Sequence, residues 1–178
     1  MNNQFTIEIR PATLADAEAI VRVHVTAWQE SYQGIIEQNY LDNLSYEDRL
    51  GFRKQILMDQ AASSIHLVAL YENQIVGFCD AGPSSTKPQD HRGEIYAIYL
   101  LEGYKHLGIG TKLMNVAMAH LSQHGLTPSI TWVLEENKPA CSFYEKYGGQ
   151  KTGENSVEYN RIAHKTVSYV FGIDENQI

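Results

Sequence analysis

Two kinds of hydrophobic spacing follow one another in the N-terminal part of the chain. Phe5, Ile7 and Ile9 are separated by single polar residues, which predicts a strand over Phe5–Arg10. Thr13 then provides a helix cap, with Asp16 three residues on. Behind this cap, positions recur at helical spacing and predict one buried helix face, made of Ala17, Ile20, Val21, His24, Ala27 and Trp28.

Gly34 ends this predicted helix, and two more helices follow. A short one covers Gln38–Leu44, and another begins at Ser45 with Asp48 in the capping-box position. The later strands and helices are predicted at Ile65–Tyr71, Ile75–Ala81, Glu94–Leu101, Ile109–His124, Ile130–Leu134, Lys138–Tyr147, Ser156–Tyr159 and Lys165–Phe171. A turn over Glu72–Gln74 joins the first two of these strands, and the longest loop-like run is Gly82–Asp90. This order predicts an α/β (α+β) fold, a mixed sheet with helices on both faces, in one domain over residues 1–178.

Composition narrows the classes of function. The formal net charge of −7 argues against a nucleic-acid partner, which needs clustered Lys and Arg. Neither a signal peptide nor a membrane-spanning run is recognisable, so we expect no membrane association. Cys79 and Cys141 are isolated thiols, which fits a reducing, cytoplasmic location. His120 and His124 have metal-ligand spacing but no third ligand beside them, so no metal site is expected.

The most informative segment is the loop between the predicted strand and the helix at Ile109. Gly108 and Gly110 lack side chains, so backbone amides at the start of that helix can approach an anion closely. Lys105 and His106 add positive potential. The order Gly110-Thr111-Lys112 does not fit a Walker A loop, and Leu113 breaks a dinucleotide fingerprint. The physical chemistry favours a pyrophosphate.

Lys105–Gly110 resembles the Gln/Arg-x-x-Gly-x-Gly/Ala signature of the GNAT superfamily of N-acetyltransferases, with Lys105 in place of Gln or Arg. Asn137–Gly149 is similar to the family's NxxAxxFYxxxGF element, except that Gly149 replaces the Phe. The resemblance extends from Ile7 onward. It implies the GNAT fold, with about six to seven strands and a sheet splayed between the fourth and fifth, and acetyl-CoA as cosubstrate.

The resemblance also implies roles for individual residues. The pyrophosphate would be held by Lys105, His106, Leu107, Gly108, Ile109, Gly110 and Thr111. The pantetheine arm would pair with the backbone of Ile98, Tyr99 and Leu100, and Asn137 is a pantetheine contact, a helix cap or both. Tyr144 would be the general acid near the sulfur of coenzyme A, against the alternative that it only packs with Phe143 and Tyr147.

Two further assignments are open. Glu94 is either the base that accepts the amine proton or an ordinary strand-end carboxylate that points to solvent. Trp28, Glu30 and Tyr32 lie where family members form the acceptor pocket, and aromatic residues with an acid would suit a cationic amine. Trp28 also fits the alternative of a core residue.

The expected function is transfer of an acetyl group from acetyl-CoA to a primary amine of a small molecule or a protein, by direct attack in a ternary complex. The alternatives are a coenzyme A sensor without turnover and an enzyme that uses a longer acyl-CoA. The amine itself is not readable from the sequence. A homodimer is compatible with the family.

Overall fold

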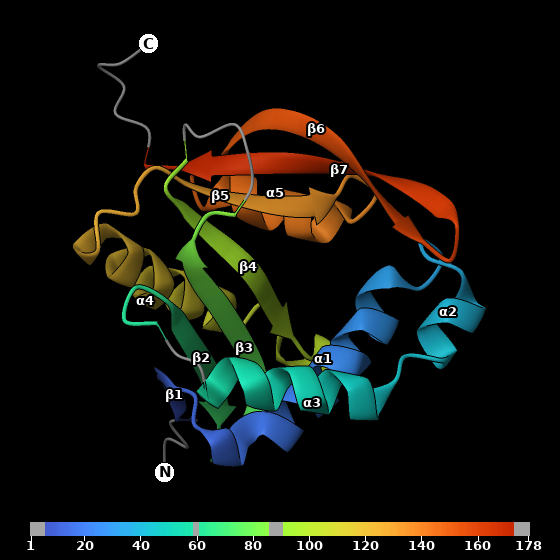
Figure 1. Cartoon of the computed structure of the whole chain (residues 1–178), viewed down its shortest axis with the longest axis horizontal. Helices are drawn as coiled ribbons and strands as arrows, with labels where there is room; N and C mark the ends of the chain where they lie inside the picture. Colours follow the sequence, from blue (N-terminus) through green and yellow to red (C-terminus); the bar gives the residue numbers. More distant parts are fainter. Residues whose placement is uncertain (1–5, 59–60, 86–90, 173–178) are drawn as a thin grey trace.

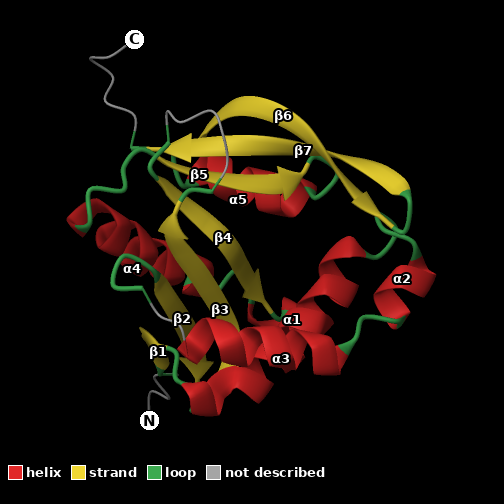
Figure 2. Cartoon of the chain, viewed as in Figure 1, coloured by secondary structure: helices red, strands yellow, loops and turns green. Residues whose placement is uncertain are grey.

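Seven strands form one sheet in the order β1-β2-β3-β4-β5-β7-β6, and helices cover both faces (Figures 1 and 2). The computed structural model describes residues 6–58, 61–85 and 91–172. All neighbouring strands are antiparallel except β4 and β5, which are parallel. The mixed sheet predicted from the sequence is therefore confirmed.

The elements follow the predicted order closely up to α5. The strands are β1 Ile7–Pro11, β2 Ile65–Tyr71, β3 Gln74–Pro83, β4 Gly93–Leu100, β5 Ser129–Leu134, β6 Gln150–Tyr159 and β7 Ile162–Phe171. The helices are α1 Ala17–Tyr32, α2 Gln38–Asp42, α3 Tyr46–Met58, α4 Ile109–Gln123 and α5 Lys138–Lys146, with 3-10 turns at Leu14–Asp16 and Glu102–Tyr104. Phe5 and residues 86–90 of the predicted loop lie outside the described residues.

Each face of the sheet has its own buried cluster. Leu113, Met114 and Ala117 of α4 pack with Cys141 and Tyr144 of α5 against one face. Ile20 and Val23 of α1 and Leu57 of α3 pack against the other, over Val68 and Phe78. The helical spacing that predicted α1 and α4 thus reflects burial of one side of each helix.

The parallel pair β4 and β5 separates after two residues. Gly93 pairs with Ser129 and Glu94 with Ile130, and no later pair is formed. On its other edge, β4 keeps pairing with β3 up to Leu100, but the register shifts so that Tyr96 is an extra residue. A bulge of this kind bends a strand and strengthens its twist. The bulge at Tyr96 therefore turns β4 away from β5, as the expected splay requires.

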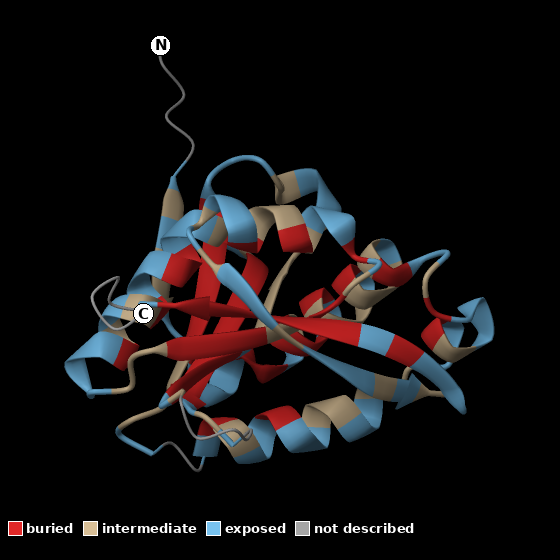
Figure 3. Ribbon diagram, turned by 90° about the horizontal axis from the view of Figure 1, so that it is seen from above, coloured by how far each residue is buried: buried red, intermediate tan, exposed pale blue. Residues whose placement is uncertain are grey.

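The C-terminal hairpin differs from the sequence prediction. Strand β6 begins at Gln150, not Ser156, and β7 begins at Ile162, not Lys165. The early residues of β6 are almost all exposed because β6 is the last strand of the sheet (Figure 3). Its sequence is polar on both faces and lacks the alternation that identifies a half-buried strand. Gln74, predicted in a turn, belongs to β3, because Glu72 and Asn73 with positive φ already close a two-residue turn.

A buried ionic network joins α3 to the sheet. The guanidinium of Arg53 donates two hydrogen bonds to the carboxylate of Asp80, at 2.8 and 2.9 Å. His66 Nδ1 lies 2.7 Å from Asp80 Oδ1. Because the carboxylate is compensated on both sides, the charges can be buried without the penalty of an isolated ion. This network fixes α3 over β2 and β3.

Candidate active site

Helix α4 begins with unoccupied backbone donors. Gly108, at its N-terminal cap, has φ 78° and ψ 2°, a left-handed conformation that favours glycine. A Cβ at this position would meet no atom within 4 Å, so the cap faces open space. No side chain caps the helix and its first turn has no acidic residue. The free amides and the positive end of the helix dipole can therefore receive an anion.

Gly110 has a different task from Gly108. A Cβ at Gly110 would lie 3.3 Å from Cε2 of Phe143 and 3.5 Å from Cδ1 of Leu100. The absence of a side chain allows the first turn of α4 to approach α5 and the end of β4. The two glycines of the predicted signature thus meet separate requirements, one of conformation and one of packing.

The cationic side chains of the loop add less positive potential at the start of α4 than the sequence predicted. Lys105 Nζ forms an ion pair with Glu102 Oε2 at 2.5 Å, so much of its charge is balanced within the loop. His106 is exposed and has a positive φ of 63°. Leu107 is also exposed, and Thr111 lies on the exposed side of the first helical turn. Backbone amides are consequently the donors that this loop offers most freely to an anion.

Tyr144 reaches the interior of the splay from α5. It is 6% exposed, and its hydroxyl lies close to the side chain of Thr131 on β5. Thr131 Oγ1 in turn donates to the carbonyl of Ile95 at 3.0 Å, across the gap where β4 and β5 part. Burial raises the pKa of Tyr144 well above its ordinary value, so the hydroxyl keeps its proton at neutral pH.

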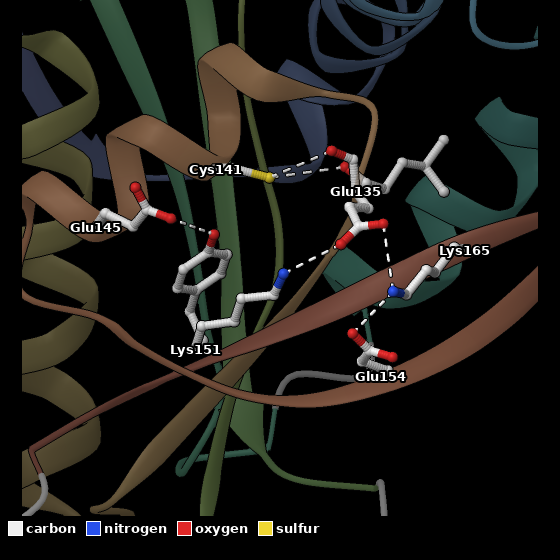
Figure 4. A network of polar contacts seen from close by, with 8 residues as sticks. Glu135, Cys141, Glu145, Lys151, Glu154 and Lys165 are labelled. Atoms are coloured by element: carbon white, nitrogen blue, oxygen red, sulfur yellow. Dashed lines mark hydrogen bonds and ion pairs between the residues drawn. The ribbon is translucent and has the colours of Figure 1, made fainter.

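A network of polar contacts fixes α5 against β5, β6 and β7 (Figure 4). Tyr169 donates to Glu145 Oε1 at 2.8 Å, and Cys141 Sγ lies 3.8 Å from the carbonyl oxygen of Leu134. Glu135 forms ion pairs with Lys151 and Lys165. The helix that carries Tyr144 is therefore held from both ends.

Aromatic side chains gather on the other side of β4. Tyr99 Oη lies 3.2 Å from Tyr32 Oη. Trp28 contacts Tyr32, with ring centroids 5.0 Å apart, and Tyr159 of the β6–β7 hairpin, at 5.5 Å. Trp28, Tyr32, Tyr99 and Tyr159, with His24, are called the aromatic cluster below. It joins α1, β4 and the C-terminal hairpin.

His24 lies inside this cluster as a neutral imidazole. Its ring stacks on Tyr99 with centroids 5.3 Å apart, and Arg49 Nη1 lies 3.4 Å from its Nε2. Burial lowers the pKa of His24 to about 4, and the neighbouring charges of Arg49 and Arg53 add to this effect. Since the guanidinium of Arg49 can only donate, the ring accepts at Nε2.

The shifted pKa of His24 predicts a pH-dependent loss of stability. Unfolded His24 takes up a proton near pH 6.5 and folded His24 near pH 4, so between these values the unfolded state binds more protons. The free energy of unfolding should fall by about 3 kcal/mol as the pH drops through this window. Urea melts of the wild type and of His24→Gln from pH 7.5 to 4 test this. Parallel curves for the two proteins would contradict it.

The remaining predicted site residues have other partners. Glu94 is buried at the start of β4, where its Oε2 accepts from Ser84 Oγ and the amide of Ser85. Because Glu94 is buried, the interpretation of a carboxylate that points to solvent is wrong. Glu30 Oε2 accepts a hydrogen bond from the amide of Glu102 at 2.9 Å. It therefore connects α1 to the segment Glu102–Gly110 that leads into α4, called the phosphate loop below.

Asn137 is a helix cap, the second of the two interpretations given above. Its Oδ1 accepts from the amide of Ala140 at 3.2 Å, which caps α5. Its side chain also hydrogen-bonds to Tyr32. Asn137 therefore joins the N-terminus of the helix carrying Tyr144 to the aromatic cluster.

The sequence pointed to Tyr144 but not to Thr131, Arg49 or Tyr159. Thr131 lies in a short apolar strand that gives no sign of a polar partner. Arg49 is one of several charged residues of α3, and no local pattern distinguishes it. The prediction that His24 lies on the buried face of its helix is correct. A histidine on such a face was the one sequence feature that indicated a polar partner nearby.

No group of three or more His, Cys, Asp or Glu side chains arranged to hold a metal occurs in the described ranges. His120 and His124 have ring centroids 4.2 Å apart. No helix within those ranges is long and apolar enough to cross a bilayer.

The loop at an uncapped helix, the splayed parallel strands and the buried tyrosine define an acyl-coenzyme A dependent acyltransferase, and comparison with known proteins agrees. The sequence model of the acetyltransferase (GNAT) family matches residues 24–149. The chain belongs to this family of acyltransferase enzymes.

Relatives match over most of the chain. An uncharacterised N-acetyltransferase of Bacillus subtilis, YuaI, is 30% identical over 161 residues, which cover 90% of each protein. A spermidine N(1)-acetyltransferase of Thermoplasma acidophilum is 26% identical over 149 residues, 80% of this chain and 88% of that one. The crystal structure of PaiA N-acetyltransferase from the same organism, in complex with coenzyme A, superposes with a TM-score of 0.72 at 22% identity. The superposition covers 93% of this chain and 99% of that one.

Proposed function

We propose that the protein transfers an acetyl group from acetyl-CoA to a primary amine, by direct attack of the amine in a ternary complex. The observation that carries the proposal is the edge of β4 at Ile98–Leu100, which lacks a partner strand beside the buried hydroxyl of Tyr144. The uncapped start of α4 is the nearby anion site.

The described residues fit coenzyme A at these two places. Amides around Gly108–Gly110 would bind the pyrophosphate, helped by the helix dipole. The free edge of Ile98–Leu100 would pair with the amides of the pantetheine arm, as an added strand does. The cosubstrate supplies the activated acetyl thioester. The protein's own contribution is orientation and control of protons.

Tyr144 would act on the sulfur side of the reaction. Its high pKa keeps the proton on Oη, where it can be donated to the sulfur as negative charge develops there. The buried surroundings of this hydroxyl exclude water.

Glu94 would accept the amine proton through water. It precedes Tyr99 by five positions on β4, which at 3.3 Å per residue is about 16 Å along the strand. We therefore propose transfer through water, with the carboxylate at the far end of a water chain.

Glu94→Gln should lower kcat/KM at neutral pH by about tenfold, below the roughly 10²–10⁴-fold of a directly placed base. The amide keeps an acceptor for Ser84 and Ser85, so the fold should persist. The pH profile of kcat/KM should shift upward, because the amine must then lose its proton to bulk water. An unchanged profile would assign Glu94 a structural role only.

The experiment that tests the function is release of free thiol from acetyl-CoA in the presence of a panel of primary amines. Acceleration by one or more amines, with the N-acetyl product identified by mass spectrometry, supports the proposal. Coenzyme A binding without any turnover would favour a sensor. Faster turnover of propionyl-CoA or butyryl-CoA would favour a longer acyl donor.

A further inference from the structure

Two arginines of α3 lie over aromatic rings, and only one of them has an acidic partner. Arg53 Cζ is 4.8 Å from the ring centroid of Phe78, and its guanidinium is fully engaged by Asp80. Arg49, one turn earlier, is 5.0 Å from the ring centroid of Trp28. Of the described carboxylates, none forms an ion pair with Arg49.

Arg49 carries its charge into the aromatic cluster. It is half-buried and contacts His24, which stacks on Tyr99. Its charge also acts on Tyr159 of the β6–β7 hairpin. A guanidinium in this position is next to the side chains that border the splay, and His24 offers it only a neutral acceptor.

Two carboxylates near the C-terminal hairpin have polar partners, and Glu158, beside Tyr159 on β6, is exposed to solvent. Glu37 accepts a hydrogen bond from Asn160 at the tip of the hairpin. Glu136 Oε2 lies 3.6 Å from His164 Nδ1. Glu30, which the sequence suggested as the acid of the acceptor side, is bound to the phosphate loop. The charge that the described contacts bring directly onto the aromatic cluster is that of Arg49, over Trp28 and beside His24.

We infer that the acceptor amine carries an anionic group, a carboxylate or a phosphate, which Arg49 binds, while an apolar part of the acceptor packs on Trp28. This inference rests on the proposed function and specifies its substrate class. The planar guanidinium suits both anions because it can donate two parallel hydrogen bonds. Polyamines, whose other groups are cationic, should be poor acceptors. The ring of His24 lies between Arg49 and Tyr99. This spacing suits an acceptor whose anionic group is only a few bonds from the reacting amine.

The test uses acceptor pairs that differ in the anion alone, with the full chain and acetyl-CoA. α-Amino acids are compared with the amines that lack their carboxylate, such as phenylalanine with 2-phenylethylamine, and phosphoethanolamine is compared with ethanolamine. We expect kcat/KM to be at least tenfold higher for the acid-bearing member of one pair. Which pair shows the preference distinguishes a carboxylate from a phosphate.

Variants assign the preference to Arg49. Arg49→Gln should reduce the preference by about 10–100-fold, mainly through KM, as expected for the loss of charged hydrogen bonds. Arg49→Lys should retain part of it. Lys54→Gln removes one charge from an exposed position of the same helix and should leave the preference unchanged. Thermal melts confirm that each variant is folded.

A binding measurement separates this inference from the proposed function. N-acetylphenylalanine and N-acetyl-2-phenylethylamine, and likewise N-acetylphosphoethanolamine and N-acetylethanolamine, are titrated calorimetrically into the coenzyme A-loaded wild type and Arg49→Gln. If the acid-bearing member of a pair binds more tightly than its partner and Arg49→Gln abolishes this difference, the inference is supported. This holds even if no amine is turned over, in which case only the proposed function fails. Equal or weaker binding of both acids, or a preference for spermidine, overturns the inference while leaving the transferase intact.

Discussion

Tyr144→Phe is expected to lower kcat by roughly 10²–10⁴-fold, the usual contribution of a placed proton donor. The substitution keeps the ring, which packs between Tyr169 and Phe171, and removes only the oxygen. Coenzyme A should still bind, because the start of α4 and the edge of β4 are unchanged. The loss of the buried hydroxyl beside Thr131 should change the free energy of unfolding by no more than about 1 kcal/mol. Steady-state kinetics beside thermal melts measure both effects.

Tyr147→Phe is the matched control for this experiment. It removes a hydroxyl from the residue that ends the same helix, where Tyr147 Oη donates to Asn115 Oδ1 at 2.8 Å, outside the splay. Its kcat should stay within about twofold of the wild type. If Tyr144→Phe retained full activity, or if both variants lost activity equally, the acid role of Tyr144 would be wrong and the hydroxyl would serve packing alone.

Gly108→Asp is expected to weaken coenzyme A binding by more than 100-fold while leaving the fold intact. The new carboxylate would occupy the open space at the start of α4 and repel the pyrophosphate. Two like charges about 4 Å apart near a protein surface repel by roughly 4 kcal/mol, and 1.4 kcal/mol is a factor of ten in affinity. Asp is among the residues found most often at positive φ, so the strain of leaving glycine should cost about 1 kcal/mol of stability and the protein should stay folded. Calorimetry with coenzyme A measures the affinity.

Gly108→Asn separates charge from shape at this position. Asn also tolerates a positive φ and has nearly the same volume as Asp, but it carries no charge. It should lose much less affinity than Gly108→Asp, and added salt should narrow the difference. Equal losses in the two variants would indicate a steric effect. Near-normal binding in both would place the pyrophosphate elsewhere.

The parts of the protein that were predictable from the sequence depend on local geometry. A glycine with positive φ at a helix start, an Asn cap and one buried helix face are properties of a few neighbouring residues. The reason for a glycine at position 149 could be seen only in the structure, where a Cβ would lie 2.7 Å from Cε1 of Phe171. The ring of Phe171, distant in sequence, takes the space beside this residue, which explains why a side chain is absent.

The aromatic cluster, proposed above as the acceptor side, was less predictable because its residues come from distant segments. Trp28 and His24 belong to α1, Arg49 to α3 and Tyr159 to a strand whose sequence pattern is polar. Only the twist of the sheet and the length of the β6–β7 hairpin bring Tyr159 onto Trp28. Glu30 was expected in the acceptor pocket from its position near the end of α1, but its side chain binds the phosphate loop instead.

The β6–β7 hairpin has a consequence for how such an enzyme changes over time. The groups assigned to coenzyme A lie in one continuous stretch from β4 to α5, whereas the hairpin that completes the aromatic cluster follows it in the chain and lies beyond residue 149, where the family match ends. Substitutions in the hairpin can alter Tyr159 and its neighbours without disturbing the phosphate loop or Tyr144. If the aromatic cluster borders the acceptor, as proposed, the hairpin is a position at which new acceptors can be acquired while the acyl donor and the chemistry are inherited unchanged.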